Sequence, residues 1–170
     1  KQPCGCSSNI RLYRYTVGQS FGKHIDESHY DDRLGGITKY TLLVYLNSAT
    51  SAFVTAELNT TGKYYTGIFI LDYSYKKHHI YYCFIVNSSY MYFDYISDEV
   101  GASGGGGGTE CIGGETAFYK GVGDRQVVAE VVPQTGRLLL HGHGSHCLTH
   151  EGRPVFSGVK YLLRTDVVYR

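Results

Sequence analysis

The stretch GRPVFSGVKYLLRTDVVY, residues 152–169, shows most clearly which fold class this chain adopts. Its glycines and its proline are typical of a tight connection, and the β-branched and aromatic residues that follow predict a strand. The same alternation of strand and turn recurs along the chain. It predicts strands at residues 9–16, 39–47, 113–119, 126–132, 136–141 and 158–169. Many short strands joined by turns are typical of a sandwich, a barrel or a jelly roll, so an all-β fold with at most minor helices is expected.

Composition limits the classes of function. The chain has 170 residues, 42% of them hydrophobic, which is enough for one compact domain with a core, and we predict a single domain over residues 1–170. The net charge is +1 and no run of basic residues is longer than Lys76-Lys77, so nothing supports binding to nucleic acid. No apolar run approaches the length of about 18 residues that a membrane span needs, so no membrane partner is expected.

The cysteines bear on the compartment. There are five, an odd number at irregular spacing, which is a poor disulfide framework and favours a reducing, intracellular location. Cys4-Gly5-Cys6 has no second pair of ligands at zinc-finger spacing, so an ordinary flexible terminus is expected there. The start at Lys1, without Met, suggests that an N-terminal part and any targeting signal are missing.

Residues 48–112 interrupt the rhythm of strands and turns. They contain a tyrosine-rich tract and end in a glycine run, Gly101–Gly108, which has the composition of a flexible linker. Three interpretations stay open for this insert: an ordered hairpin that acts as a lid, a disordered segment, or sequence wrongly retained in a gene model. Its β propensity is high, so the first interpretation is physically reasonable.

Histidines and acidic residues form the pattern that carries chemistry. His24 and Asp26 are two positions apart, and such residues on a strand point to the same side of a sheet. Near the C-terminus stand four more histidines, His141, His143, His146 and His150, and Lys160 follows the last of them by ten positions. Two imidazoles and one carboxylate on one face of an iron leave three coordination positions open, as in non-haem Fe(II) oxygenases.

These residues occur in blocks that resemble a known family. YTVGQSFGKHID, YTLLVYLN, GGETAFY, VVPQTGRLLLH and HEGRPVFSGVKYLLRTDVVY are similar, in order, to segments of the 2-oxoglutarate- and Fe(II)-dependent dioxygenases, in the prolyl 4-hydroxylase-like branch. The resemblance covers residues 9–47 and 113–169 and omits the insert. It implies a double-stranded β-helix, a jelly roll with a metal between its two sheets.

The resemblance also implies roles for individual residues. His24, Asp26 and His150 would bind Fe(II), and Lys160 would pair with the distal carboxylate of the co-substrate 2-oxoglutarate, which the Tyr15 hydroxyl would also reach. The expected activity is hydroxylation of a substrate C–H bond with release of succinate and CO2, with L-ascorbate as a further cofactor. The substrate is unknown; a protein side chain such as proline is favoured, and a small molecule is possible.

Alternatives remain at several positions. Arg164 shares strand parity with Lys160, so it could take or share the co-substrate carboxylate. His141 is the fallback metal ligand, His143 and His146 are expected on the cavity rim, and His29 is expected in a loop. The glycines of GGET are expected to form a bulge or a close strand approach.

Two readings without catalysis also remain. A cupin-like metal-binding jelly roll would keep the metal ligands but would have no use for Lys160 or Tyr15. An inactive dioxygenase fragment would bind iron and never turn over.

Overall fold

Strands are the main secondary structure of the described chain. The computed structural model describes residues 1–50, 68–74, 79–85, 111–120 and 123–170, and the only helix in these ranges is the short 3-10 turn η1. The strands are β1 (Pro3–Cys6), β2 (Arg11–Thr16), β3 (Phe21–His24), β4 (Tyr30–Asp31), β5 (Gly36–Tyr45), β6 (Ala49–Thr50), β7 (Ile68–Ser74), β8 (His79–Ile85), β9 (Cys111–Gly113), β10 (Thr116–Lys120), β11 (Gln126–Val131), β12 (Leu138–Gly142), β13 (Thr149–Gly152), β14 (Val155–Ser157) and β15 (Val159–Tyr169), with η1 at Gly144–His146.

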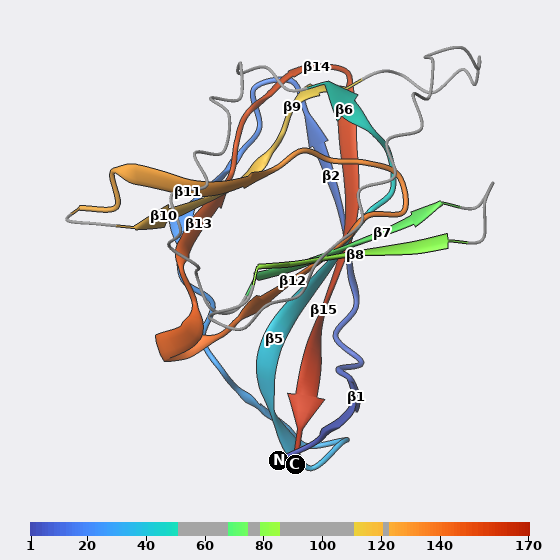
Figure 1. Ribbon diagram of the computed structural model, residues 1–170, viewed down its shortest axis with the longest axis vertical. Helices are drawn as coiled ribbons and strands as arrows, with labels where there is room; N and C mark the ends of the chain where they lie inside the picture. The colour runs from blue at the N-terminus through green and yellow to red at the C-terminus, as the bar shows by residue number, and fades with distance from the viewer. Residues whose placement is uncertain (51–67, 75–78, 86–110, 121–122) are drawn as a thin grey trace.

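The strands form a large sheet and a smaller sheet that face each other (Figure 1). The large sheet has the order β1-β15-β5-β12-β7-β8, with β2 also paired to β15 and β4 to β5. The smaller sheet has the order β11-β10-β13-β3, and a third sheet of short strands has the order β14-β9-β6. All pairs in the first two sheets are antiparallel. The predicted all-β jelly roll is therefore confirmed.

The core lies between the large sheet and the smaller sheet. It consists of apolar side chains from β5, β12 and β15 on one side and from β10 and β11 on the other: Leu43, Tyr45, Leu139, Leu162, Phe118, Ala129 and Val131. β10 is buried along nearly its whole length because it is an inner strand of its sheet. Burial of this apolar surface fixes the separation of the sheets and so the position of the groups between them.

Most of the strand predictions hold, and two local expectations do not. The six predicted strands correspond to β2, β5, β10, β11, β12 and β15. The Cys4-Gly5-Cys6 segment is not a flexible terminus, because β1 pairs with β15 at the sheet edge. Asp26 is not on a strand with His24: β3 ends at His24, and Asp26 lies in the connection that follows.

The predicted insert is described only in part. Its strands β7 and β8 pair with each other, and β7 pairs with β12, so this portion extends the large sheet. Residues 51–67, 75–78 and 86–110, including the glycine run, lie outside the described residues, and the three interpretations of the insert stay as they were. In the ranges that are described, no helix has both the length and the apolar character needed to cross a membrane.

Candidate metal centre

Two imidazoles meet on the smaller sheet. His150 on β13 is the register partner of His24 on β3, and the two ring centroids are 4.3 Å apart. His24 Nδ1 lies 2.8 Å from Gly22 O, and His150 Nδ1 lies 2.9 Å from Leu148 O. A carbonyl oxygen can only accept, so each Nδ1 carries a proton, and Nε2 is the nitrogen of each ring that can bind a metal. This is the way metal-binding histidines are held by their surroundings.

The Asp26 carboxylate lies against both imidazoles. Its Oδ1 is 3.4 Å from His24 Nε2, and its Oδ2 is 3.8 Å from His150 Nε2. One ligand atom from each of His24, Asp26 and His150 can be chosen so that all three lie within 4.8 Å of one another. We call these three residues the triad. The main chain fixes the carboxylate, since Asp26 O accepts the Gly144 N–H at 2.8 Å and Asp26 N–H donates to Cys147 Sγ at 3.2 Å.

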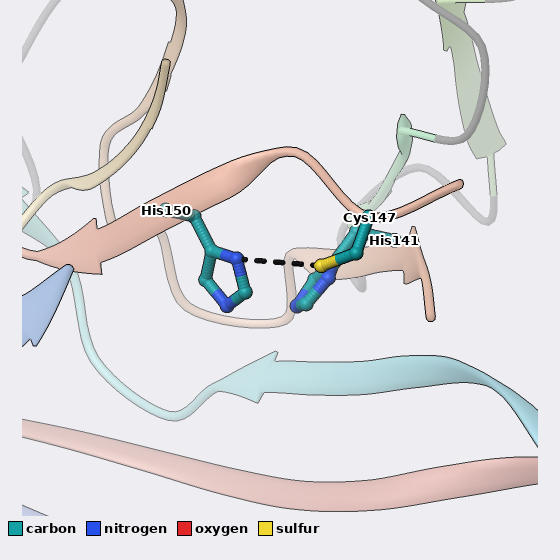
Figure 2. A group of neighbouring side chains, drawn as sticks. All are labelled: His141, Cys147 and His150. Carbon is teal, nitrogen blue, oxygen red and sulfur yellow. Dashed lines mark hydrogen bonds between the residues drawn. The ribbon is translucent and has the colours of Figure 1, made fainter. Parts of the chain in front are cut away.

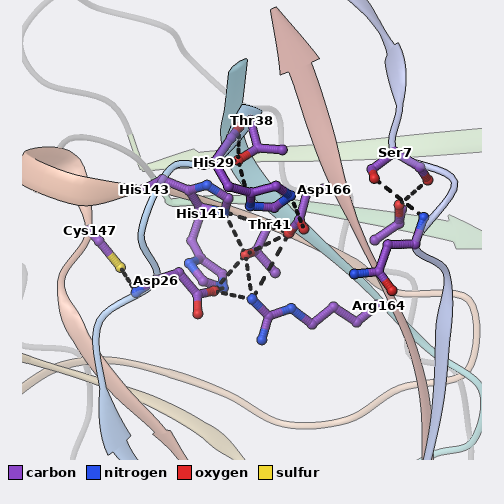
Figure 3. A network of polar contacts seen from close by, with 12 residues as sticks. Ser7, Asp26, His29, Thr38, Thr41, His141, His143, Cys147, Arg164 and Asp166 are labelled. Carbon is purple, nitrogen blue, oxygen red and sulfur yellow. Dashed lines mark hydrogen bonds and ion pairs between the residues drawn. The ribbon is translucent and has the colours of Figure 1, made fainter. Parts of the chain in front are cut away.

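The large sheet contributes the partners of Asp26 Oδ2 (Figure 3). Arg164 Nη2 on β15 lies 2.9 Å from this oxygen, and Thr41 Oγ1 on β5 donates to it at 2.5 Å. The single Thr41 proton is used in this bond, so His143 Nε2–H donates to Thr41 Oγ1, at 2.8 Å. Asp26 thus joins the two sheets at the point where the triad stands.

The charges of the triad follow from these contacts. Burial acts to raise the pKa of Asp26, but its interaction with His24 and its hydrogen bond with Thr41 outweigh burial and hold the pKa well below the usual value. Burial lowers the pKa of His150 to about 4, while the adjacent carboxylate raises the pKa of His24. At neutral pH the site therefore holds an ionised carboxylate and a neutral His150 imidazole, the forms in which both bind metals.

All six residues predicted for the site line one cavity between the sheets. They are Tyr15, His24, Asp26, His150, Lys160 and Arg164. The cavity has a volume of about 50 Å³. On β15 the lining positions Lys160, Leu162 and Arg164 alternate with outward-facing ones, as the predicted parity requires.

Lys160 is a buried basic residue in the wall of this cavity. It is 3% exposed, its Nζ donates to Gly114 O at 2.5 Å, and its register partner on β2 is Tyr15, whose ring centroid lies 5.5 Å from Nζ. Burial lowers the pKa of Lys160 to about 8. A Cβ on Gly114, which has a φ of +75°, would lie 2.9 Å from Lys160 Cδ. The close approach expected at GGET is therefore present, and the absence of a Cβ on Gly114 leaves room for the Lys160 side chain.

The structure separates the two basic residues that were candidates for a carboxylate. Arg164 is paired with Asp26, whereas Lys160 lies at the Tyr15 end of the cavity and contacts a backbone carbonyl. Which of them binds a co-substrate is not tested by these contacts, and Lys160 stays the predicted partner.

The remaining histidines fall into three environments. His141 on β12 is buried, and its Nε2 lies 3.8 Å from Asp26 Oδ2. His143 is also buried, 3.6 Å from Asp166 Oδ1, and together with His146 it lines a second cavity rather than the one with Lys160. His29 lies in a connection, as expected, and its ring contacts the Thr38 hydroxyl.

A divalent metal fits the triad. His24 Nε2 is buried and has no hydrogen-bond partner among the described residues, so this nitrogen is available to bind a metal ion. Two neutral nitrogens and one carboxylate suit Fe(II) and similar ions. The donor chemistry therefore agrees with the ligand set that the sequence suggests.

Known proteins resemble this chain in structure rather than in sequence, and the structural likeness is distant. No family model matches the sequence, and no curated protein matches it. Among solved structures, the chain is similar to a viral collagen prolyl hydroxylase from Paramecium bursaria Chlorella virus-1, in a complex with 2OG, at 17% identity and a TM-score of 0.40. The alignment covers 97% of this chain and 63% of that one, so the chain spans less than two thirds of its neighbour. A likeness at this level carries no conclusion about activity.

Proposed function

We propose that this chain is a 2-oxoglutarate-dependent oxygenase that holds Fe(II) with His24, Asp26 and His150 and hydroxylates a C–H bond of its substrate. The observation that carries the proposal is the orientation of the two imidazoles. Each donates a hydrogen bond from Nδ1–H to a backbone carbonyl and directs Nε2 toward the Asp26 carboxylate. When bound, the metal and 2-oxoglutarate supply the oxidising power, with succinate and CO2 as the other products.

Lys160 and Tyr15 support 2-oxoglutarate as the co-substrate. A purely structural metal site needs no buried ammonium, yet Lys160 lies in the same cavity as the triad at 3% exposure. Its Nζ donates to Gly114 O, and a carboxylate bound in the cavity would offset more of the cost of burying this ammonium.

Arg164 and Thr41 would act on the metal ligand rather than on the co-substrate. By occupying Asp26 Oδ2, they leave Oδ1 as the oxygen that faces His24 and favour binding through one oxygen only. Binding through one oxygen keeps more coordination positions free for co-substrate and dioxygen. The two residues are therefore positioning residues in this proposal.

The substrate that we propose is a protein side chain such as proline. Support comes from the similarity of the H-x-D, His and Lys pattern at His24, Asp26, His150 and Lys160 to prolyl 4-hydroxylase-like enzymes. A small molecule is the second candidate. Proline-containing peptides and free small molecules, offered separately, distinguish the two by which of them accelerates 2-oxoglutarate consumption.

The test is 2-oxoglutarate turnover without added substrate. Protein with Fe(II), ascorbate and 2-oxoglutarate is expected to form succinate slowly, and Asp26→Ala is expected to abolish this activity. His146→Ala is the matched control, because it removes an exposed imidazole from the connection between β12 and β13, outside the triad. Iron binding by the wild-type chain without any succinate or 2-oxoglutarate binding would point instead to a metal-binding jelly roll.

A further inference from the structure

A second group of metal-binding side chains adjoins the triad (Figure 2). His141, Cys147 and His150 offer ligand atoms that all lie within 4.8 Å of one another. Cys147 Sγ is 3.7 Å from His150 Nδ1. In a tetrahedral zinc site with bonds of about 2.3 Å to sulfur and about 2.0 Å to nitrogen, the two donor atoms stand roughly 3.5 Å apart. Cys147 and His150 therefore need to move very little to share an ion, and His141 lies within reach of it.

Cys147 and His141 offer donor atoms for such a role. Cys147 is a free cysteine whose sulfur accepts the Asp26 N–H at 3.2 Å; burial raises the pKa of its thiol, so a metal that binds there displaces the thiol proton. His141 is 2% exposed, and its Nδ1 has no hydrogen-bond partner among the described residues. An unpartnered buried nitrogen of this kind costs free energy, which a metal ion would recover.

We propose that His141, Cys147 and His150 form a second metal site, the thiol site, that takes Zn²⁺ or a similar thiophilic divalent ion. Two nitrogens and one sulfur supply three of the four ligands that Zn²⁺ prefers, and a water molecule or a small anion completes the set. The sulfur makes the thiol site softer than the triad, whose third ligand is a carboxylate. The two sites consequently select different metals.

Occupation of the thiol site competes with the triad because both use His150. A neutral imidazole has one lone pair. In this structure the proton is on Nδ1, held by Leu148 O, which directs the lone pair of Nε2 to the triad. Binding at the thiol site uses Nδ1, the nitrogen that faces Cys147, and moves the proton to Nε2. Zn²⁺ would thereby lower the affinity of the triad for Fe(II); this consequence rests on the proposed function, whereas the thiol site itself does not.

Co²⁺ is the probe that distinguishes the two sites. Co²⁺ bound to a thiolate gives an intense charge-transfer absorption in the near ultraviolet, whereas Co²⁺ bound only to nitrogen and oxygen does not. Anaerobic titration of the full chain with Co²⁺ is expected to produce this band. Cys147→Ser and His141→Phe are expected to remove it, and His24→Ala is expected to keep it. A band that survives Cys147→Ser, or no band in the wild-type chain, overturns the proposal.

Other thiols need a matched control. Cys4 and Cys6 lie two positions apart on β1 and could bind Co²⁺ themselves, so the titration is repeated in a Cys4→Ser/Cys6→Ser variant. The band is expected to persist there. Its loss in that variant would assign the ion to β1 and refute the thiol site.

A second measurement uses the wild-type chain and avoids variants that fail to fold. Zn²⁺ is expected to slow alkylation of Cys147 by iodoacetamide by more than about tenfold, measured by mass spectrometry against the same chain without metal. Equal rates with and without Zn²⁺ would contradict the proposal. Protection of Cys147 in a chain that shows no 2-oxoglutarate turnover would retain the thiol site and reject the proposed function, so the two failures are distinguishable.

Discussion

Replacement of Lys160 by Met is expected to stabilise the metal-free protein while it removes co-substrate binding. Lys160 is 3% exposed, and burial lowers its pKa from 10.5 to about 8. At pH 7 the unfolded chain therefore gains more from protonation of this lysine than the folded chain does. The shift corresponds to roughly 3 kcal/mol against folding, since each pKa unit is about 1.4 kcal/mol.

The pH dependence gives this prediction its sign. Between pH 8 and pH 10.5 the unfolded chain binds the extra proton, so the Lys160 contribution makes the protein more stable as the pH rises through this window. Met has a similar length and no charge, but it leaves Gly114 O without its donor, at a cost of about 1 kcal/mol. The variant is therefore expected to be more stable than wild type by about 2 kcal/mol at pH 7. The difference falls to zero at about pH 10 and reverses to about 1 kcal/mol in favour of wild type well above pH 10.5, where only the lost hydrogen bond remains.

Urea unfolding at several pH values measures the difference between the two proteins. Taking the difference cancels the tyrosines that titrate in the same range. In parallel, Lys160→Met is expected to weaken 2-oxoglutarate binding by more than about 30-fold, because a buried charged contact is worth about 2 kcal/mol or more, while metal binding is little changed. A variant that is less stable than wild type by the same amount at every pH would refute the reasoning about the buried amine.

Three further substitutions test the neighbours of the triad. Arg164→Met is expected to destabilise the metal-free protein by about 3 kcal/mol, because it leaves the buried Asp26 carboxylate without its cation, and added metal should restore part of the loss in thermal unfolding. Thr41→Val removes a donor to the same carboxylate, so the pKa of Asp26 should rise and acid unfolding should begin at a higher pH; an unchanged acid transition would contradict the hydrogen bond. Gly114→Ala should cost about 1–2 kcal/mol at a φ of +75° and weaken 2-oxoglutarate binding more than metal binding, which isothermal titration measures.

The strands could be predicted from the sequence because their patterns are local. The run from Val159 to Tyr169 and the apolar run in β5 show strand periodicity without any knowledge of their partners. The parity of Lys160 and Arg164 likewise predicted that both face inward. β1 and β3 carry weaker patterns, because each has only four residues and β1 is stabilised by its pairing with β15.

The contacts that complete the site could not be predicted because they join distant parts of the chain. Arg164 meets Asp26 from the opposite sheet, and strand parity says nothing about which carboxylate a basic residue will find. Thr41 did carry a signal, as a polar residue within the apolar run of β5, but only the structure shows that it holds Asp26. His141 was the fallback ligand, and it lies beside Cys147 in the proposed thiol site.

The central claim is that one site holds Fe(II) and 2-oxoglutarate together. Anaerobic titration of the Fe(II)-loaded chain with 2-oxoglutarate tests it most directly, by the weak visible absorption that arises when a keto acid chelates iron through two oxygens. The account predicts that this band appears in the wild-type chain, disappears in Asp26→Ala and requires a much higher concentration of 2-oxoglutarate in Lys160→Met. A folded, iron-loaded chain that shows no band at saturating 2-oxoglutarate would contradict it.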